Sequence, residues 1–367
     1  STRTSSMYAS GDEGISKERT AFRNEEKRYQ LHREQTFLTR RNKKKGGPLV
    51  TRHTSLEDVV DLKDLREMVE KGGENNMHGI KRKANCANDV VAYEIPERPG
   101  CLLIPNALDL TTQRNWLVQS VTSLCEPPAE TNHNVTQGNI EGLWQASLRG
   151  QWLVKNTNQD CDSSVTNRWS DDAPSTSGQN EKKSAQVLLE KLRWATLGPP
   201  YDWTKRVYKD KTVYSNVPED IRRHCIRLAA GAGHPEFKAS AGLVNYYRAG
   251  DALAGHVDDA EKDLSKPIVS FSLGSPCVFL IGGDTRDTKP VAVILRSGDA
   301  IVLSGLARKR FHGVPRVFVE DDGTLDVDGV LLKAPKEVSD KIIWTDEPFV
   351  AEYVRGGRVN VSVRDID

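Results

Sequence analysis

The sequence predicts an α+β fold in which helices buttress a jelly-roll (double-stranded β-helix) core. The second half of the chain contains short segments rich in Val, Ile, Leu and Phe, bounded by glycine-containing turns. Several short antiparallel strands at regular spacing are typical of a closed double sheet. The first half contains helical patterns and a basic stretch. With 367 residues, 37% of them hydrophobic, the chain can bury one large core plus extensions.

Six segments have strand-like patterns. They are residues 241–247, 267–274, 276–281, 291–296, 299–304 and 358–364. In the last of these, Val359, Val361 and Val363 alternate with polar residues, so the strand has one valine face and one polar face. That pattern alone is also typical of a solvated edge strand. The polar face, however, carries two guanidinium groups, whose forked donors match carboxylates.

Helical patterns surround the predicted strands. Either Asp109 or Thr111 is expected to begin one helix, and Pro218 another, and these helices are expected to buttress the barrel. Near the N-terminus, Ile15, Phe22 and Tyr29 recur every seven residues. This thin apolar stripe predicts a helix that lies along the domain surface or pairs as a coiled coil. A capping-box pattern at residues 54–57 predicts a further helix, ending before residue 72.

These patterns divide the chain near residue 99. Residues 1–99 are expected to form a helical, basic N-terminal extension and a linker, and residues 100–367 the jelly-roll domain. Within that domain, residues from about 155 to 184 are rich in Asn, Asp, Ser and Thr. Such a composition cannot build a core, so it predicts a mobile surface insertion.

Two histidines and one aspartate have the spacing of a metal site. His256 and Asp258 project to the same side of a strand, close enough to chelate one metal. Most isolated pairs of this kind bind nothing, but His312 follows after enough strand-like sequence for the chain to return to the site. Two neutral imidazoles and one carboxylate, with coordination positions left open, form the facial triad of non-haem Fe(II) oxygenases. The three residues therefore predict a catalytic iron site.

Taken together, the motifs resemble those of the AlkB-type Fe(II)/2-oxoglutarate-dependent dioxygenases. The resemblance covers about residues 100–367, and it rests on residues 245–250, 256–258, 267–274, 282–283, 297–299, 312 and 358–364. The last segment resembles the family's Arg-x-Asn-x-Thr-x-Arg signature, with Ser362 in place of Thr. Within the family, residues 188–198 are similar to the first eukaryotic AlkB homologue.

The resemblance implies a role for each matching residue. The iron ligands would be His256, Asp258 and His312, and the residues that bind 2-oxoglutarate would be Asn245, Tyr247, Arg358, Asn360 and Arg364. Substrate contacts would come from Trp194 and Tyr201, as an aromatic lid over a flipped base, and from Arg286, on a phosphate. Ala260 stands where a bacterial relative has an acidic residue that helps to read the base, so base preference does not transfer simply.

The implied activity is oxidative demethylation of nucleic-acid bases, with Fe(II), 2-oxoglutarate and O₂ as cofactor and cosubstrates. Candidate substrates are 1-methyladenine in tRNA, 6-methyladenine in DNA and 3-methylcytosine, with oxidation of 5-methylcytosine in tRNA as a related reaction. N-demethylation would release formaldehyde and succinate. A base must leave its stack to reach such a site, so unpaired, bulged or stem-loop substrates are expected.

The chain as a whole is not basic, but one stretch of it carries the positive charge that a nucleic-acid partner would favour. The net charge is +1, but residues 17–45 contain eleven Lys and Arg against four Glu, or about +7. This stretch is expected either to neutralise phosphates, with a salt-dependent contribution, or to be a solvated helix and tail.

Cysteines and hydropathy suggest the compartment. The six cysteines are scattered and include no Cys-x-x-Cys motif, which suits a reducing environment. No segment reaches transmembrane length, so no membrane association is expected. The family resemblance implies residence in the nucleus, the mitochondrion or the cytosol, and a monomer is expected.

Two other functions remain open. The same iron site would serve a protein demethylase or hydroxylase, for example one acting on histone methyl-lysine. A non-catalytic nucleic-acid-binding protein with a vestigial site would be expected to lack a ligand or an arginine, and none is missing. A protein demethylase would turn over peptides with indifference to Trp194 and Arg286. An enzyme of either kind, unlike a binding protein, would lose turnover in His256→Ala while binding stays largely intact.

Overall fold

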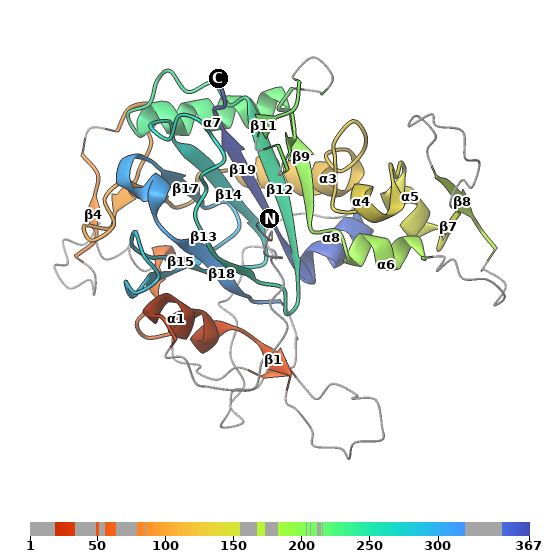
Figure 1. Ribbon diagram of the computed structural model, residues 1–367, viewed down its shortest axis with the longest axis horizontal. Helices are drawn as coiled ribbons and strands as arrows, with labels where there is room; N and C mark the ends of the chain where they lie inside the picture. The colour runs from red at the N-terminus through yellow and green to blue at the C-terminus, as the bar shows by residue number, and fades with distance from the viewer. Residues whose placement is uncertain are drawn as a thin grey trace, which may run out of the picture.

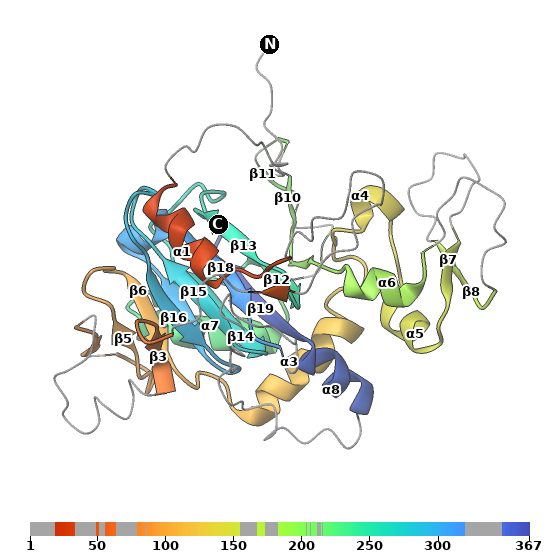
Figure 2. The ribbon, with the colours of Figure 1, turned by 90° about the horizontal axis from the view of Figure 1, so that it is seen from below.

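The computed structural model confirms a jelly roll buttressed by helices. It describes residues 19–33, 49–50, 56–63, 79–84, 86–154, 167–172, 183–202, 204–205, 207–210, 214, 216–319 and 347–367. Two sheets lie face to face, and the chain passes repeatedly from one to the other (Figures 1 and 2). The helix predicted after residue 54 is wrong over residues 56–61, where a turn leads into the short strand β3 (Val60–Asp61), and the part after residue 63 lies outside the described residues.

The larger sheet has eight strands in the order β4-β5-β6-β17-β14-β19-β12-β9. Their bounds are Lys81–Arg82 (β4), Tyr93–Glu94 (β5), Cys101–Ile104 (β6), Ala300–Leu303 (β17), Ile268–Gly274 (β14), Gly357–Arg364 (β19), Ala241–Arg248 (β12) and Trp194–Leu197 (β9). All of its strand pairs are antiparallel. The predicted final strand is therefore central rather than an edge strand, with β14 on one side and β12 on the other.

The smaller sheet has five strands in the order β13-β18-β15-β16-β3. Their bounds are Leu253–His256 (β13), His312–Val317 (β18), Cys277–Ile281 (β15), Val291–Leu295 (β16) and Val60–Asp61 (β3). Only the short β3 runs parallel to its neighbour. All six predicted strands are present, with bounds that differ by no more than two residues from those expected.

Helices cover the outer face of the larger sheet, as expected. Asp109 caps α3 (Leu110–Thr122) by accepting a hydrogen bond from the amide of Thr112 at 2.7 Å, and Pro218 precedes α7 (Glu219–Gly231). The three valines of β19 belong to the same buried cluster as Trp116 of α3. The valine face of β19 therefore packs towards the helices, which leaves its polar face for the interior of the barrel.

Smaller elements form a lobe beside the barrel (Figure 2). They are α4 (Asn134–Gln137), α5 (Leu143–Leu148), β7 (Trp152–Val154), β8 (Arg168–Ser170) and α6 (Ala185–Glu190). Strand β8 lies within the expected mobile insertion, yet it pairs with β7, and Trp169 donates a hydrogen bond to the carbonyl of Glu141 at 2.7 Å. Pairing with a neighbour outside the insertion explains why composition did not indicate this strand.

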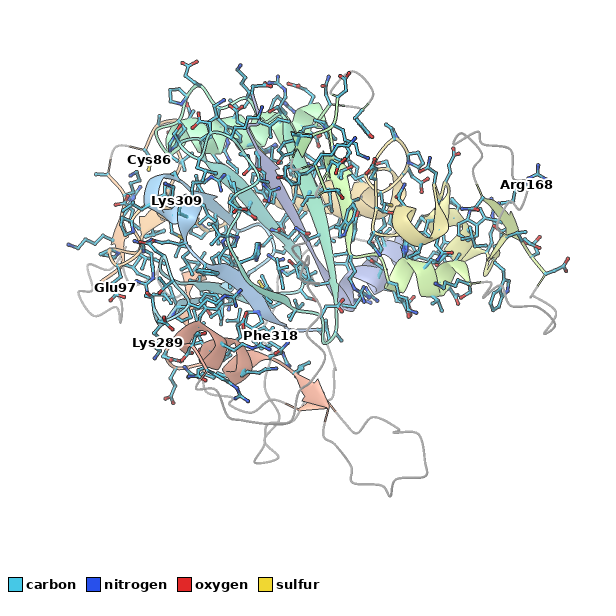
Figure 3. The ribbon with its side chains drawn as sticks, viewed as in Figure 1. Cys86, Glu97, Arg168, Lys289, Lys309 and Phe318 are labelled. Atoms are coloured by element: carbon cyan, nitrogen blue, oxygen red, sulfur yellow. The ribbon has the colours of Figure 1, made fainter. Side chains whose placement is uncertain are left out.

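The N-terminal helix α1 (Ala21–Tyr29) packs on the outside of the smaller sheet. Phe22 is fully buried, and its ring approaches so closely that a Cβ on Gly255 would lie 2.3 Å from it. The side chain of Glu26 accepts a hydrogen bond from the amide of Gly255 at 2.5 Å. Figure 3 places Lys289 and Phe318 beside this helix. The apolar stripe therefore packs on the domain surface, as predicted for Phe22, while Ile15 lies outside the described residues.

Further described parts of residues 1–99 join the sheets. Strand β3 pairs with β16, and β5 pairs with β6. A separate pair is formed by β1 (His32–Arg33) and β2 (Leu49–Val50). The division of the chain near residue 99 stays a prediction.

The remaining elements are two hairpin strands, a 3₁₀ helix and a terminal helix. Strands β10 (Tyr201–Asp202) and β11 (Val207–Tyr208) pair with each other, η1 (Gly305–Lys309) follows β17, and α8 (Pro348–Arg355) precedes β19. Among the described residues, none of the helices is both long and apolar enough to cross a membrane.

Candidate active site

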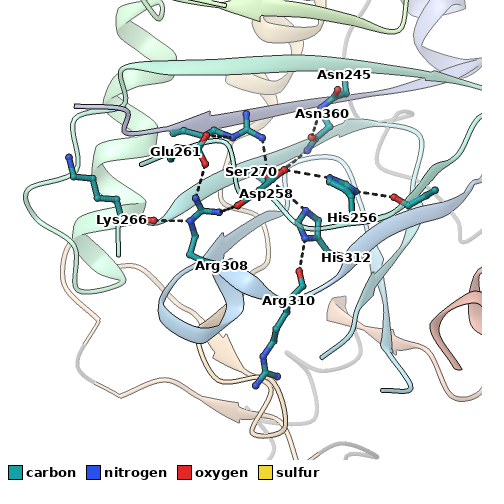
Figure 4. A network of polar contacts seen from close by, with 12 residues as sticks. Asn245, His256, Asp258, Glu261, Lys266, Ser270, Arg308, Arg310, His312 and Asn360 are labelled. Carbon is teal, nitrogen blue, oxygen red and sulfur yellow. Dashed lines mark hydrogen bonds and ion pairs between the residues drawn. The ribbon is translucent and has the colours of Figure 1, made fainter. Parts of the chain in front are cut away.

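His256, Asp258 and His312 meet where β13 and β18 pair. His256 ends β13 and lies opposite His312, which begins β18. One ligand atom from each of the three residues lies within 4.8 Å of the others. The Nε2 atoms of His256 and His312 are 3.5 Å and 3.8 Å from the Asp258 carboxylate oxygens (Figure 4). These side chains could hold one Fe(II) and leave further coordination positions open.

Backbone contacts orient both imidazoles for metal binding. Nδ1 of His256 lies 2.9 Å from the carbonyl of Ala254, and Nδ1 of His312 lies 3.2 Å from the carbonyl of Arg310. A carbonyl can only accept, so each Nδ1 must carry the proton. The lone pair is therefore on Nε2, the atom that faces Asp258, as metal-binding histidines require.

Electrostatics favours the metal-binding protonation states of His312 and Asp258, whereas Asp258 raises the pKa of His256 although burial alone would lower it. Burial lowers the pKa of His312 to about 4, so this imidazole is neutral near pH 7. Burial alone would raise the pKa of Asp258. The charge of Arg364, whose Nη2 is 3.1 Å away, is the largest of the opposing effects, which together hold the pKa of Asp258 well below its usual range. The carboxylate is therefore ionised.

Arg358 supplies an independent test of whether the site fits 2-oxoglutarate. The residue is 2% exposed, and its Nη2 donates to the hydroxyl of Ser272 at 2.9 Å. Its Nε and Nη1 are buried and have no hydrogen-bond partner within the described parts of the chain. Buried guanidinium donors without an acceptor are costly, so an anion that accepts from both atoms would be strongly favoured. A carboxylate of 2-oxoglutarate has the matching geometry.

Strand register brings the other predicted cosubstrate residues beside Arg358. Tyr247 pairs with Arg358, whose guanidinium carbon lies 5.3 Å from the tyrosine ring centroid, and Asn245 pairs with Asn360. We call the inner faces of β12, β14 and β19 around these residues the cosubstrate wall. Asn360 donates through its side chain to the hydroxyl of Ser270 at 2.8 Å.

Sequence reasoning missed Ser270 and Ser272. Both lie on β14, and they hold Asn360 and Arg358 in place. Their spacing of two in an otherwise apolar strand was the available signal, since alternate residues face the same side. It also missed Glu261, which lies among the arginines near Asp258.

The predicted substrate residues lie on three different elements. Trp194 begins the edge strand β9 opposite Asn245, and both residues are half-buried. Tyr201 belongs to the β10–β11 hairpin, with its ring centroid 5.1 Å from that of Tyr208. Arg286 donates to the carbonyl of Gly255 at 2.6 Å and lies over Phe311 at 4.9 Å. The substrate roles of Trp194, Tyr201 and Arg286 stay predictions.

Part of the basic N-terminal stretch is engaged within the protein. Arg28 forms a forked ion pair with Asp58, with Nη2 at 2.6 Å from one carboxylate oxygen. Arg23 bonds to Glu26 on the same helix. Residues 34–45, which carry the Arg40–Lys45 cluster, lie outside the described residues.

The fold and the site define the class of protein. Residues 145–364 match the model of the 2OG-Fe(II) oxygenase superfamily, a range that contains every predicted iron and 2-oxoglutarate residue. The chain therefore belongs to this superfamily and is a dioxygenase that uses Fe(II), 2-oxoglutarate and O₂.

Relatives narrow the class to AlkB-type enzymes similar to ALKBH1. The chain is 34% identical to the Arabidopsis thaliana DNA N(6)-methyladenine demethylase ALKBH1A, over 98% of this chain and 100% of that protein. It is 32% identical to the Mus musculus nucleic acid dioxygenase ALKBH1, over 75% of this chain and 66% of that protein. The tRNA demethylase abh1 of Schizosaccharomyces pombe is 30% identical over 61% of this chain and 70% of that protein. The resemblance drawn from the motifs is confirmed.

Proposed function

We propose that this enzyme oxidatively demethylates bases in unpaired, bulged or looped nucleic acid, with His256, Asp258 and His312 as the iron ligands. The observation that carries the proposal is full-length similarity to a DNA N(6)-methyladenine demethylase, together with a metal triad whose ligand atoms lie within 4.8 Å of one another. The relatives differ in their substrates, DNA in one and tRNA in another. The shared chemistry is the removal of a methyl group from a base.

The chain's own residues orient the reactants. Arg358 would hold one carboxylate of 2-oxoglutarate through its unpaired Nε and Nη1, with the Ser272 hydroxyl fixing its third nitrogen. Arg364 keeps Asp258 ionised. Fe(II) with 2-oxoglutarate and O₂ supplies an oxidant that hydroxylates a methyl carbon, with succinate and carbon dioxide as coproducts. The hydroxymethyl group on nitrogen then leaves as formaldehyde.

The base would enter from the side of the β10–β11 hairpin. Tyr201 and Tyr208 present two aromatic rings there, and aromatic rings are the usual platform for an unstacked base. We further propose that the enzyme is a monomer and that it works in the nucleus, the mitochondrion or the cytosol. The five described cysteines are free thiols, which is compatible with these reducing compartments.

The test measures formaldehyde and succinate with oligonucleotides that contain 1-methyladenine, 6-methyladenine or 3-methylcytosine. Each is supplied unpaired and as a matched duplex. We expect turnover with at least one unpaired substrate, and less with its duplex, because the duplex adds the cost of extracting the base. His256→Ala should abolish turnover and leave oligonucleotide binding largely intact.

Two results would contradict the proposal. One is the lack of turnover on every unpaired substrate by protein shown to contain iron. The other is efficient turnover of methyl-lysine peptides that is indifferent to Trp194→Ala and Arg286→Ala, which would indicate a protein demethylase.

A further inference from the structure

A buried carboxylate lies directly behind the candidate iron site. Glu261 follows Asp258 in the segment between β13 and β14, and its side chain is only 2% exposed. It accepts hydrogen bonds from two residues and forms an ion pair with a third, each on a separate element, and Figure 4 shows the contact with Arg308. The hydrogen bonds come from Tyr208 Oη at 2.6 Å and Arg308 Nη2 at 2.8 Å, and Arg364 Nε forms the ion pair at 3.2 Å.

Arg364 links this carboxylate to the metal. Its Nε contacts Glu261, while its Nη2 contacts the Asp258 carboxylate at 3.1 Å. One planar guanidinium therefore bridges the two acids, and its orientation is set by both. Any displacement of Glu261 would turn the Arg364 guanidinium. Its charge and its N–H donors would then move relative to the Asp258 carboxylate and the neighbouring cosubstrate site.

Arg308 fixes the segment that carries both acids. It is 1% exposed, and besides Glu261 it donates to the carbonyl of Asp258 at 3.0 Å and to that of Lys266 at 2.9 Å. These two carbonyls bracket the segment in which Glu261 lies. Because an unpaired guanidinium is costly in the interior, Arg308 and Glu261 depend on each other.

Tyr208 is the third partner, and it comes from the β10–β11 hairpin. The strands of this hairpin have two residues each and pair only with each other among the described strands. A hairpin this short has little stability of its own. The position of the hairpin therefore depends on side-chain contacts. One of them, the Tyr208–Glu261 hydrogen bond, connects the hairpin to the residues around the iron site. The ring of Tyr201 packs on that of Tyr208, so the position of Tyr201 also depends on the Tyr208–Glu261 hydrogen bond.

We propose that Glu261 is a positioning residue that couples the β10–β11 hairpin to the Fe(II) and 2-oxoglutarate site. Ordering of Arg364 by iron and cosubstrate orders Glu261, and Glu261 holds Tyr208 and the hairpin in place. Coupling of this kind is reciprocal, so a substrate that pins the hairpin also stabilises the bound cosubstrate. The role of the hairpin in gripping a base rests on the proposed function, whereas its coupling to 2-oxoglutarate does not.

Two pairs of variants separate this coupling from general damage. Tyr208→Phe and Glu261→Gln each remove one part of the contact with little change in shape. The matched controls are Tyr214→Phe and Glu130→Gln, because Glu130 accepts from the Tyr214 hydroxyl at 2.9 Å and from Lys209 at 2.5 Å in the same region. The controls loosen a neighbouring anchor of the hairpin without touching the iron site.

The first readout is amide hydrogen exchange over residues 201–209, without nucleic acid. In the wild-type protein, anaerobic Fe(II) plus 2-oxoglutarate should slow this exchange. Tyr208→Phe should abolish the slowing and leave 2-oxoglutarate affinity within about 2-fold. Glu261→Gln should abolish the slowing and weaken 2-oxoglutarate about 10-fold, because it disturbs the pairing of buried arginines. Both controls should retain the slowing.

Several outcomes would overturn the coupling. They are unchanged exchange in the wild-type protein on cosubstrate binding, retained slowing in Tyr208→Phe, or equal effects in Glu261→Gln and Glu130→Gln. If Glu261→Gln does not fold, Tyr208→Phe still tests the coupling, because it removes only one oxygen atom. Because no nucleic acid is present, these outcomes are independent of whether any methylated base is turned over.

With a methylated oligonucleotide, Tyr208→Phe should raise 2-oxoglutarate consumption per formaldehyde released.

Discussion

The cosubstrate wall and the β10–β11 hairpin hold their functional side chains in different ways. Arg358 projects from the eight-residue β19, which is paired along its length with β12 and with β14. Tyr201 projects from a strand of two residues that pairs only with its hairpin partner among the described strands. The wall is built from continuous backbone hydrogen bonds, whereas the hairpin depends on individual side chains.

The difference separates two requirements of the enzyme. Oxidation needs the metal, the cosubstrate and their ligands in one fixed arrangement, which a rigid barrel provides. Admission of a base needs an element that can move and then close, and such elements come from regions with few stabilising contacts. The two should therefore respond differently to substitution.

Arg358→Lys tests the rigid side and should have the largest effect. Lysine keeps the charge but loses the forked donors, so two of the hydrogen bonds proposed for 2-oxoglutarate cannot form together. We expect the KM for 2-oxoglutarate to rise about 10- to 100-fold. The comparison would be wrong if the KM changed no more than in Arg222→Lys, a control on the exposed side of α7.

Tyr201→Ala tests the β10–β11 hairpin and should have an intermediate effect. Loss of a stacking platform should raise the KM for a methylated oligonucleotide about 5- to 30-fold. The KM for 2-oxoglutarate should change little, because Tyr201 has no part in the wall. Tyr201→Phe keeps the ring and should restore the oligonucleotide KM. An equal loss in Tyr201→Phe would argue against stacking.

Asp299→Asn tests what burying a carboxylate in the barrel costs in free energy of unfolding, and it should have the smallest effect. Asp299 lies in the turn before β17, and burial raises its pKa to about 6. Its folded pKa exceeds the unfolded value, so the native state binds more protons between the two pKa values. Stability should therefore rise as the pH falls through 6, by about 1.4 kcal/mol between pH 7.5 and pH 5 from this group.

Asn at position 299 removes that titration. The difference in unfolding free energy between the wild-type protein and Asp299→Asn, measured by denaturant titration at both pH values, isolates the contribution. A difference that is constant with pH, or one of opposite sign, would show that Asp299 is not held in this state.

Periodicity explains what the sequence could predict. Strand β19 was recognised because its valines and polar residues alternate, and α3 because Asp109 caps a helical stripe. The triad was predictable because His256 and Asp258 are only two residues apart, although β13 ends at His256 and Asp258 follows it. The position of β19 in the centre of the sheet was not predictable, because its pairing partners are distant in sequence.

The Glu261 network could not be predicted for the same reason. Tyr208, Glu261, Arg308 and Arg364 lie on four separate segments. The first three look like ordinary surface residues in sequence, and Arg364 was expected to bind 2-oxoglutarate rather than to pair with Glu261. Only the folded arrangement shows that the four share a buried carboxylate. The pairing of β8 with β7 was missed because a few ordered residues lie within a polar stretch.

The central position of β19 has a consequence for how the protein is made. Synthesis proceeds from the N-terminus, so β12 and β14 leave the ribosome about a hundred residues before the strand that lies between them. Until then each of these strands has an unpaired edge, and an exposed edge can template aggregation. Such distant pairing also slows folding. Nascent chains of this enzyme should therefore need chaperone protection, and they should acquire 2-oxoglutarate binding only after β19 has inserted.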